Sequence, residues 1–261
     1  MIYVSHLLED QEMRELLQST RMGVESIEFS IAYNLDHLTQ TLKTYEKRLE
    51  AMGCEELILH GPFLDLNPAA FDSEIARVTR YRYEQAYAAA KTLGAKKIIY
   101  HSCHVPTVYM RQGWASRVAA FYKEFLEDKT DEIQILMENV LDPVPELLWE
   151  CAEEITHPAF GLCLDVGHAH CYSKEPLGKW LKENEPYIRH LHVHDNCGDR
   201  DCHLALGQGN LPLEELVTCL HKGMDCTIEC NTREDVLHTH DWIWKNLMQR
   251  GTEERNEKGL W

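Results

Sequence analysis

Basic side chains are scarce in this chain of 261 residues, which has 26 Lys and Arg against 43 Asp and Glu and a formal charge of −17. Nucleic-acid-binding faces gain affinity from Lys and Arg that neutralise phosphates, so this balance argues against a broad face of that kind. Long apolar runs are also missing, and none approaches the roughly 20 residues that a membrane span requires. The composition therefore fits a protein that neither crosses a membrane nor presents a broad basic surface.

No two of the ten cysteines form a Cys-x-x-Cys pair, so a structural zinc ribbon is not expected. The first 16 residues contain no basic segment followed by an apolar one, so no secretory signal is expected. Without export, reduced thiols are the default, and several cysteines are expected to pack as small buried hydrophobes. We therefore expect a cytoplasmic protein without disulfides.

Short aliphatic runs alternate with longer amphipathic stretches along the whole chain. Eight runs are predicted to be strands: residues 2–4, 24–29, 57–60, 97–101, 133–138, 161–165, 189–194 and 226–230. The stretches predicted to be helices include residues 35–52, 73–93, 114–126, 144–155, 213–221 and 235–249. Gly53 and Gly94 follow two of these helices, where a left-handed cap is expected.

Eight strand–helix units in sequence predict a parallel sheet, and eight strands are the number that closes a (β/α)8 barrel. A doubly wound sheet would need a glycine-rich phosphate loop after its first strand. Here the first strand runs directly into Ser5-His6-Leu7-Leu8. We therefore predict a single α/β domain over residues 1–261, a (β/α)8 TIM barrel, with residues 250–261 as a polar C-terminal tail.

Metal-binding side chains stand at or just after the ends of the predicted strands three to eight, where the active sites of such barrels lie. Imidazole nitrogens and carboxylate oxygens bind divalent zinc, manganese, iron or cobalt. A series of nine such residues is hard to explain as core packing, and it predicts one to three divalent ions, with zinc or manganese expected. The nine are His60, His101, Glu138, Asp165, His168, His192, Asp201, His203 and Glu229.

Two short segments show how neighbouring residues can reach one ion. In LCLDVGH, Asp165 ends the strand and Gly167 allows a bend that turns His168 back toward the same ion. A buried aspartate without a cation or donors would be costly, so Asp165 needs a partner. Asp201 and His203 alternate in a later loop and can bind an ion from the same side.

Three histidines alternate along the predicted strand 189–194, so their side chains point to one face, the barrel interior. Three imidazoles in one row exceed what packing needs. We predict His192 as a metal ligand, His194 as a substrate contact or a partner of the ligands, and His190 as structural.

Glu138 and Glu229 end strands three positions apart on the ring, so they can face each other across the pocket. Such a pair can bridge a metal ion or act as acid and base on opposite faces of a substrate. Together with His168, they are the candidate catalytic residues. Glu28, at the end of the second predicted strand, is a further acid considered for the site.

Two features are candidates for binding the substrate. Residues 207–210 (GQGN) precede a helix and, with Arg233, form either an anion site centred on Gly209 or an ordinary glycine turn. Three aromatic residues in the loops after strands three and four can either stack on a sugar ring or a base or pack in the core: Phe63, Tyr109 and Trp114.

With these residues in register, the chain resembles the xylose isomerase-like TIM barrels, which include sugar and sugar-phosphate isomerases and epimerases and also endonuclease IV (AP endonuclease family 2). The segments HGPFLDLNP, LDVGHAH, HLHVHDN and DCHLALGQGN carry the resemblance. The nine-residue set is similar to the three-zinc site of endonuclease IV. The isomerases keep a smaller core with one ion, matched here by Glu138, Asp165, His192 and Glu229.

Two departures from endonuclease IV favour the isomerase branch: Gln208 stands where the endonuclease has a glutamate, and basic residues are sparse in the predicted rim loops. We therefore predict a divalent-metal-dependent isomerase or epimerase that moves a proton on a small sugar, polyol or sugar phosphate. One alternative is a trinuclear-zinc phosphoester hydrolase acting at abasic sites, the only reading with a nucleic-acid partner. A third is a non-catalytic metal-bound sugar sensor.

Overall fold

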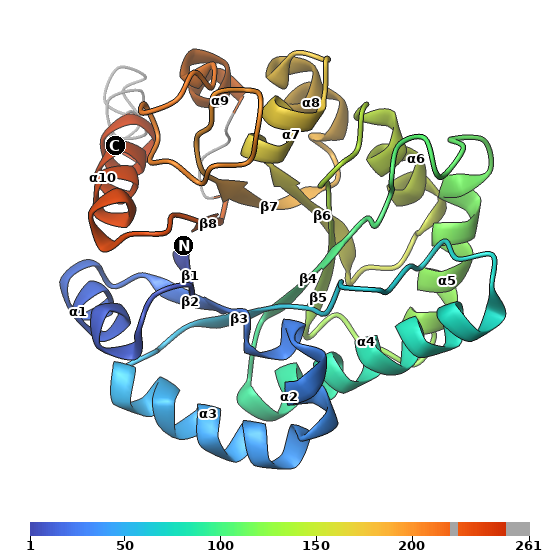
Figure 1. Cartoon of the computed structure of the whole chain (residues 1–261), viewed down its shortest axis with the longest axis horizontal. Coiled ribbons are helices and arrows are strands. Elements are labelled where there is room, and N and C mark those ends of the chain that lie inside the picture. The colour runs from blue at the N-terminus through green and yellow to red at the C-terminus, as the bar shows by residue number, and fades with distance from the viewer. Residues whose placement is uncertain (220–223, 249–261) are drawn as a thin grey trace, which may run out of the picture.

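The computed structural model describes residues 1–219 and 224–248 of the chain. Eight parallel strands form a closed barrel in which each strand pairs with its neighbours in sequence and β1 pairs with β8. The predicted (β/α)8 TIM barrel is therefore confirmed (Figure 1). The strands are β1 Ile2–Ser5, β2 Gly23–Ser26, β3 Leu57–His60, β4 Lys97–His101, β5 Gln134–Glu138, β6 Phe160–Asp165, β7 Ile188–Val193 and β8 Cys226–Ile228.

Helices surround the barrel and cover the outer face of the sheet (Figure 1). They are α1 Asp10–Thr20, α2 Ala32–Asp36, α3 Leu38–Met52, α4 Ser73–Leu93, α5 Trp114–Leu126, α6 Glu146–Glu154, α7 Val166–Tyr172, α8 Leu177–Asn184, α9 Leu213–Cys219 and α10 Arg233–Ile243. Two short pieces complete the order, a 3-10 helix at Glu28–Ser30 and a π-helical turn at Trp244–Met248. Gly53 and Gly94 have φ of 77° and 71°, as the predicted left-handed caps require.

Several predicted element boundaries differ from the structure. The second strand ends at Ser26 instead of residue 29, because the Ser26 hydroxyl accepts the N–H of Glu28 and the chain turns into the 3-10 helix. The helix predicted over 35–52 is two helices, α2 and α3, separated at His37. The helix predicted over 144–155 spans Glu146–Glu154. The last strand, predicted to reach residue 230, ends at Ile228.

Some predicted segments fall outside the described residues. The tail predicted at 250–261 is one of them, as are the last residues of the helices predicted over 213–221 and 235–249. Within the described chain, no helix has the length and apolar character needed to cross a membrane. The nine cysteines whose side chains are described are all unpaired.

The barrel interior has an apolar part and a polar part. A small cluster of buried side chains fills the apolar part: Tyr3, Ile58, Ile99, Leu136 and Cys163. Beside this cluster, the interior positions of β2, β7 and β8 carry polar groups, among them Glu25, His190 and Thr227, all fully buried, and His190 lies against the Tyr3 ring. Interior positions alternate along each strand, so the same residues that build these layers lead up to the side chains at the C-terminal ends.

Candidate metal centre

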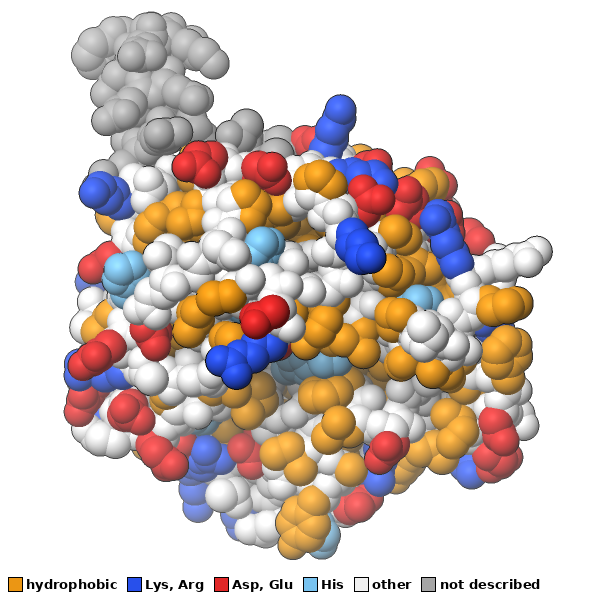
Figure 2. Space-filling model, turned by 45° about the horizontal axis from the view of Figure 1, so that its top comes forward, with side chains coloured by type: hydrophobic (Ala, Val, Ile, Leu, Met, Phe, Trp, Pro, Cys, Tyr) orange, Lys and Arg blue, Asp and Glu red, His pale blue; other side chains and the backbone are white. Residues whose placement is uncertain are grey.

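The nine side chains predicted as ligands converge at the C-terminal ends of the strands. All nine fall into groups whose donor atoms lie within 4.8 Å of one another, and the groups that contain eight of them share Glu138, Asp165, His168 and His194. His192, the ninth, is grouped with Glu25 and His190, and its Nδ1 lies 3.1 Å from Oε1 of Glu138. Figure 2 shows histidine side chains in the hollow at the centre of this face, with hydrophobic side chains around it.

The first group contains His60, His101 and Glu138. The two Nε2 atoms are 3.2 Å apart, and they lie 3.5 and 3.6 Å from Oε2 of Glu138. His60 donates its Nδ1–H to the carbonyl of Gly61 at 3.0 Å, so its Nε2 is the nitrogen that can bind an ion. Oε2 of Glu138 is buried and has no hydrogen-bond partner. Three electron-pair donors therefore point at one place.

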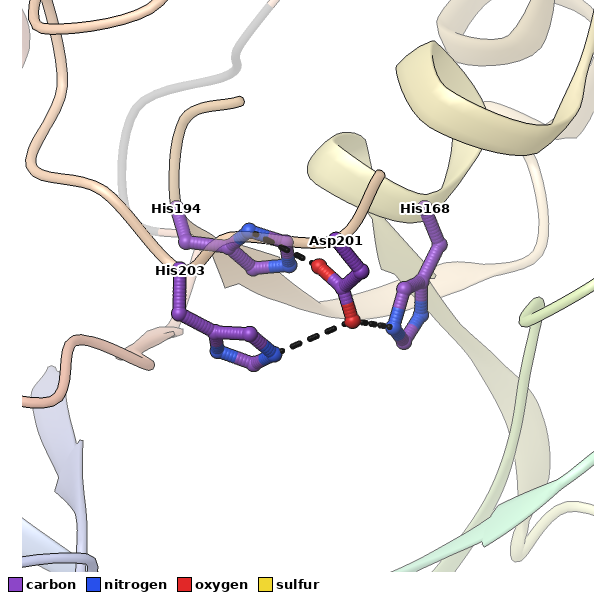
Figure 3. A group of neighbouring side chains, drawn as sticks. All are labelled: His168, His194, Asp201 and His203. Carbon is purple, nitrogen blue, oxygen red and sulfur yellow. Dashed lines mark hydrogen bonds and ion pairs between the residues drawn. The ribbon is translucent and has the colours of Figure 1, made fainter. Parts of the chain in front are cut away.

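The second group lies on the more open side of the pocket and has Asp201 at its centre (Figure 3). Oδ2 of Asp201 is 3.2 Å from Nε2 of His168 and 3.1 Å from Nε2 of His203. Both rings give Nδ1–H to main-chain carbonyls, of Asn139 at 3.0 Å and of Glu229 at 2.7 Å. A carboxylate facing two imidazole lone pairs is stable only with a cation between them, either a proton or a metal ion.

The central group is built around His192. Its Nδ1 lies 3.1 Å from Glu138, 3.3 Å from Glu229 and 3.9 Å from Asp165, measured to carboxylate oxygens. Its Nε2 lies 3.1 Å from Oε2 of Glu25. The ring is fully buried, so one nitrogen faces three carboxylates of the pocket while the other is tied to a carboxylate below it.

Neighbouring imidazoles and carboxylates of the site shift the pKa values of His168, His203 and Glu138 in favour of their charged forms. Burial works against protonation of His168, but the Asp165 and Asp201 carboxylates outweigh it and raise its pKa well above the usual value. His203 behaves in the same way, and Asp201 and Glu229 raise its pKa to about 9 despite burial. In Glu138 burial favours the neutral acid, yet the surrounding imidazoles hold the pKa well below its usual range. Without metal, protons occupy the positions where cations are required.

The geometry fits divalent ions. Two ligands bound at about 2.1 Å with tetrahedral angles lie ~3.4 Å apart, close to the 3.1–3.6 Å that separates the facing donor atoms here. Imidazoles held through the second ring nitrogen by a carbonyl or carboxylate are typical of metal ligands. His60, His168, His192 and His203 are all held this way.

Two predicted substrate contacts lie at this pocket. His194 is fully buried, with Nε2 3.2 Å from a carboxylate oxygen of Asp165 and its ring stacked on His203 at 4.1 Å. Phe63 is half-buried and stacks on the His101 ring at 4.1 Å between centroids. His194 therefore lies among the donor residues, whereas Phe63 forms part of the pocket wall.

The other aromatic candidates and Arg233 contact other side chains of the protein. Trp114 is fully buried, with its ring edge against His104, so it has no free face for a substrate and the stacking prediction is wrong for it. Tyr109 is half-buried, packs against the core and lies parallel to the exposed Phe71 at 6.4 Å. Arg233, at the start of α10, forms an ion pair with Glu15 of α1 at 3.5 Å.

The glycine-containing loop at 207–210 does bind an anion, but the anion belongs to the chain. The Asp195 carboxylate accepts the N–H groups of Gly207 at 2.8 Å and Gly209 at 3.1 Å, and also those of Asn196 and Leu211. A Cβ on Gly209 would lie 2.2 Å from the carbonyl oxygen of Asn196, so only glycine fits. The predicted substrate-anion site at Gly209 is therefore wrong, because Asp195 already uses its donors.

Sequence reasoning missed Glu25 and considered Glu28 in its place. Glu28 pairs with Arg48 at 2.8 Å instead of entering the pocket. Glu25 is fully buried inside β2 and contacts His192. The signal was a single carboxylate in the middle of the short strand GVES, at the register that faces the barrel interior.

A family model described as "Xylose isomerase-like TIM barrel" matches residues 16–250. The chain belongs to this family. Among curated proteins, an uncharacterized protein of Methanocaldococcus jannaschii, MJ1311, is 28% identical over 194 residues, which cover 68% of this chain. The chain spans less than two thirds of the length of the curated relatives it matches, 64% in MJ1311 and 61% in MJ1614 of the same organism.

Solved structures show the same fold. The TTHB071 protein from Thermus thermophilus, soaked with ZnCl2, has a TM-score of 0.74 and 23% identity, with 93% of this chain and 97% of that chain covered. A D-tagatose 3-epimerase-like protein has a TM-score of 0.75 and 22% identity, with 97% and 98% covered. At these identities the similarity concerns the barrel, and the function of this chain is argued from its own residues.

Proposed function

We propose that the protein is a divalent-metal-dependent isomerase or epimerase of a small sugar or polyol. The observation that carries the proposal is the placement of two glutamates beside one histidine nitrogen, with Glu138 and Glu229 at 3.1 and 3.3 Å from Nδ1 of His192. These carboxylates come from β5 and from the residue after β8, so they approach the pocket from different parts of the ring. Membership of the family and the similarity to an epimerase-like structure support this class of reaction.

The central donors have distinct tasks. Glu138, Asp165, His192 and Glu229 would hold the ion nearest the substrate. A divalent ion in that position acts as a Lewis acid on neighbouring substrate oxygens. The two glutamates then serve as base and acid: one removes a proton from a substrate carbon and the other returns a proton from the opposite side. His168 would help to orient Glu138, because its Nδ1 lies 3.4 Å from carboxylate oxygens of both Glu138 and Asp165.

The pocket favours an unphosphorylated substrate. The loop that commonly binds phosphate in this fold lies after strand seven, and here its N–H groups are bonded to Asp195. Arg233 is paired with Glu15, so it is not aimed at that loop as a phosphate partner. Phe63, stacked on His101, offers a wall against which a sugar ring can lie and from which water is excluded.

The test is proton exchange at carbon. The zinc- or manganese-loaded protein is incubated in D2O with a panel of ketoses and aldoses, and deuterium incorporation is followed by NMR. We expect exchange on at least one sugar, lost by at least 100-fold in Glu138→Gln and in Glu229→Gln, as removal of a general acid or base requires. Glu28→Gln, a matched change outside the pocket, should retain it. Full exchange in both site variants would overturn the mechanism.

A second candidate function is phosphoester hydrolysis. The observation that favours it is the number of donors beyond the four that one ion needs, a set made up of His60, His101, His168, Asp201 and His203. Centres with several ions stabilise both the attacking and the leaving oxygen of a phosphoester. Cleavage of an abasic-site duplex or of a nitrophenyl phosphodiester, abolished by chelator and restored by zinc, would favour this reading over the isomerase.

A further inference from the structure

A continuous row of hydrogen bonds lies inside the barrel beneath the pocket. His192 Nε2 is 3.1 Å from Oε2 of Glu25, and the same oxygen is 2.5 Å from the hydroxyl of Thr227. Thr227 is 2.7 Å from Nε2 of His190, whose Nδ1 is 3.4 Å from Nζ of Lys97. All five side chains are buried. They come from β2, β4, β7 and β8, so the row exists only in the closed barrel.

The lower end of the row is fixed by charges at the N-terminal side of the barrel. Lys97 Nζ donates to Oδ2 of Asp225 at 2.7 Å and to the carbonyl of Arg189 at 3.1 Å. The terminal ammonium of Met1 donates to the other oxygen of Asp225 at 2.5 Å. Lys97 is therefore held as a donor, and its remaining contact within the described chain is His190.

The row has one consistent direction of donation. An ammonium has no acceptor atom, so Lys97 donates to Nδ1 of His190, and the neutral His190 ring then carries its proton on Nε2. That N–H donates to the Thr227 oxygen, which leaves the Thr227 hydroxyl to donate to Glu25. Glu25, an acceptor when ionised, must then receive the Nε2–H of His192 as well.

We propose that Glu25 and Thr227 are positioning residues that hold the Nε2–H of His192 toward Glu25, so that Nδ1, which faces Glu138 and Glu229, is the nitrogen that binds the ion. A histidine held through its second nitrogen binds metal more strongly, because its ring need not rotate and the proton on Nε2 stays in place when the ion binds to Nδ1. The inference rests on the proposed metal centre and adds to it residues that touch neither ion nor substrate.

The buried carboxylate of Glu25 supports this role. Its Oε1 has no hydrogen-bond partner among the described residues, although the side chain is fully buried. An unpaired buried carboxylate oxygen costs stability, and a Gln or an apolar residue of similar size would fill the space at less cost. A glutamate at this position is explained by the need for a strong acceptor for His192.

The experiment measures affinity for zinc in metal-free protein by competition with a chelating dye. Three changes are compared with wild type: Glu25→Gln, Thr227→Val and Thr227→Ser. Glu28→Gln is the matched control, since Glu28 pairs with Arg48 and not with the site. The proposal predicts that Glu25→Gln weakens the tightest ion about 10–100-fold and Thr227→Val weakens it less, while Thr227→Ser and Glu28→Gln keep wild-type affinity.

A second readout separates positioning from general loss of structure. In the ¹⁵N spectrum of the zinc-loaded protein, His192 should show a protonated Nε2 in wild type and Thr227→Ser, with faster exchange of that proton in Thr227→Val. If Glu25→Gln does not fold, as judged by circular dichroism, the comparison of Thr227→Val with Thr227→Ser still tests the proposal. Unchanged affinity and unchanged exchange in folded variants would overturn the inference, whereas a wild type that binds no zinc would overturn the proposed metal centre itself.

Discussion

The Nε2 atoms of His60 and His101 face each other at 3.2 Å, and both lie within 3.6 Å of the same oxygen of Glu138. His60 gives its Nδ1–H to Gly61, and the Glu138 carboxylate outweighs burial and raises the pKa of His60, so a proton occupies its Nε2 when no ion is bound. Burial and the charge on His60 lower the pKa of His101 to about 3, so His101 is neutral. An ion that displaces the proton on His60 would find two imidazole nitrogens and a carboxylate oxygen arranged as a ligand set.

Removing one member of this pair should remove one ion. We expect His60→Ala to lower the zinc bound at saturation by one ion per chain, while the ion held by His192 and its carboxylates is retained. Elemental analysis after dialysis measures the ratio. His37→Ala, a change at a surface position between α2 and α3, is the control and should bind as wild type does. Equal metal content in all three proteins would contradict the assignment of His60.

Metal binding should depend on pH. Because the folded-state pKa of His203 is raised from 6.5 to about 9, a proton competes with the ion at this ring throughout that range. The apparent zinc affinity should therefore rise as pH increases from 6.5 to 9, with release of a proton detectable by calorimetry in buffers of different ionisation enthalpy. In His203→Gln the zinc affinity should depend less steeply on pH. A pH dependence identical to that of wild type would contradict a role for His203 in binding the ion.

The raised pKa of His203 also affects the stability of the metal-free protein, which should fall with rising pH, whereas zinc affinity should rise. The folded state holds a proton at His203 that the unfolded chain has lost above pH 6.5, so this contribution is complete below 6.5 and disappears as pH rises through 9. Urea denaturation of metal-free protein should therefore show stability falling over this range. Zinc-loaded protein should not show the fall, because the ion replaces the proton.

Asp195 should matter for stability. Its carboxylate is fully buried and accepts four main-chain N–H groups from the loop that follows it. Asp195→Ala should lower the free energy of unfolding by about 3 kcal/mol, since it leaves several buried donors without acceptors. The exposed Asp199 in the same loop region is the control, and Asp199→Ala should change stability little. A small effect in both would contradict the role given to Asp195.

Substitutions of Trp114 and Phe63 should distinguish a residue that stabilises the core from one that contacts the substrate. Trp114 is fully buried, so Trp114→Ala should cost roughly 3–5 kcal/mol of stability and leave KM of the folded protein unchanged. Phe63 is half-buried against His101, so Phe63→Ala should raise KM with a smaller loss of stability. Denaturation curves and steady-state kinetics measure the two effects. Reversal of the pattern would return Trp114 to the substrate site.

The barrel and the positions of its donors were open to prediction because both depend on local sequence. Each strand is a short aliphatic run, and parallel strands in a closed sheet place the residues that follow them at one end. His60, Glu138 and Asp165 could therefore be assigned to a common pocket from their position in the chain alone. The bend predicted at Gly167 is wrong, because Gly167 lies in the first turn of α7, which Asp165 caps by accepting the N–H of His168. Glycine is required there because a Cβ would lie 2.1 Å from the His194 ring.

Features that depend on distant partners could not be predicted in this way. Glu25 contacts His192 and Thr227, which are 167 and 202 positions away, so its sequence neighbours give no sign of its role. Residues 207–210 have the composition of an anion-binding loop, but whether the anion is a substrate or Asp195 depends on how the chain returns to the sheet. The burial of Trp114 could not be predicted either, because it depends on how α5 packs against the rest of the protein.

The central claim is that the nine converging side chains hold divalent ions, and the metal content per chain tests it most directly. Protein purified without added metal or chelator would be analysed for zinc, manganese, iron and cobalt, then stripped and titrated with zinc. We predict at least the one ion that the central donors hold, rising toward about three per chain on titration, as three ligand groups allow. A chain that carries no metal when purified and takes up none on titration would contradict the account.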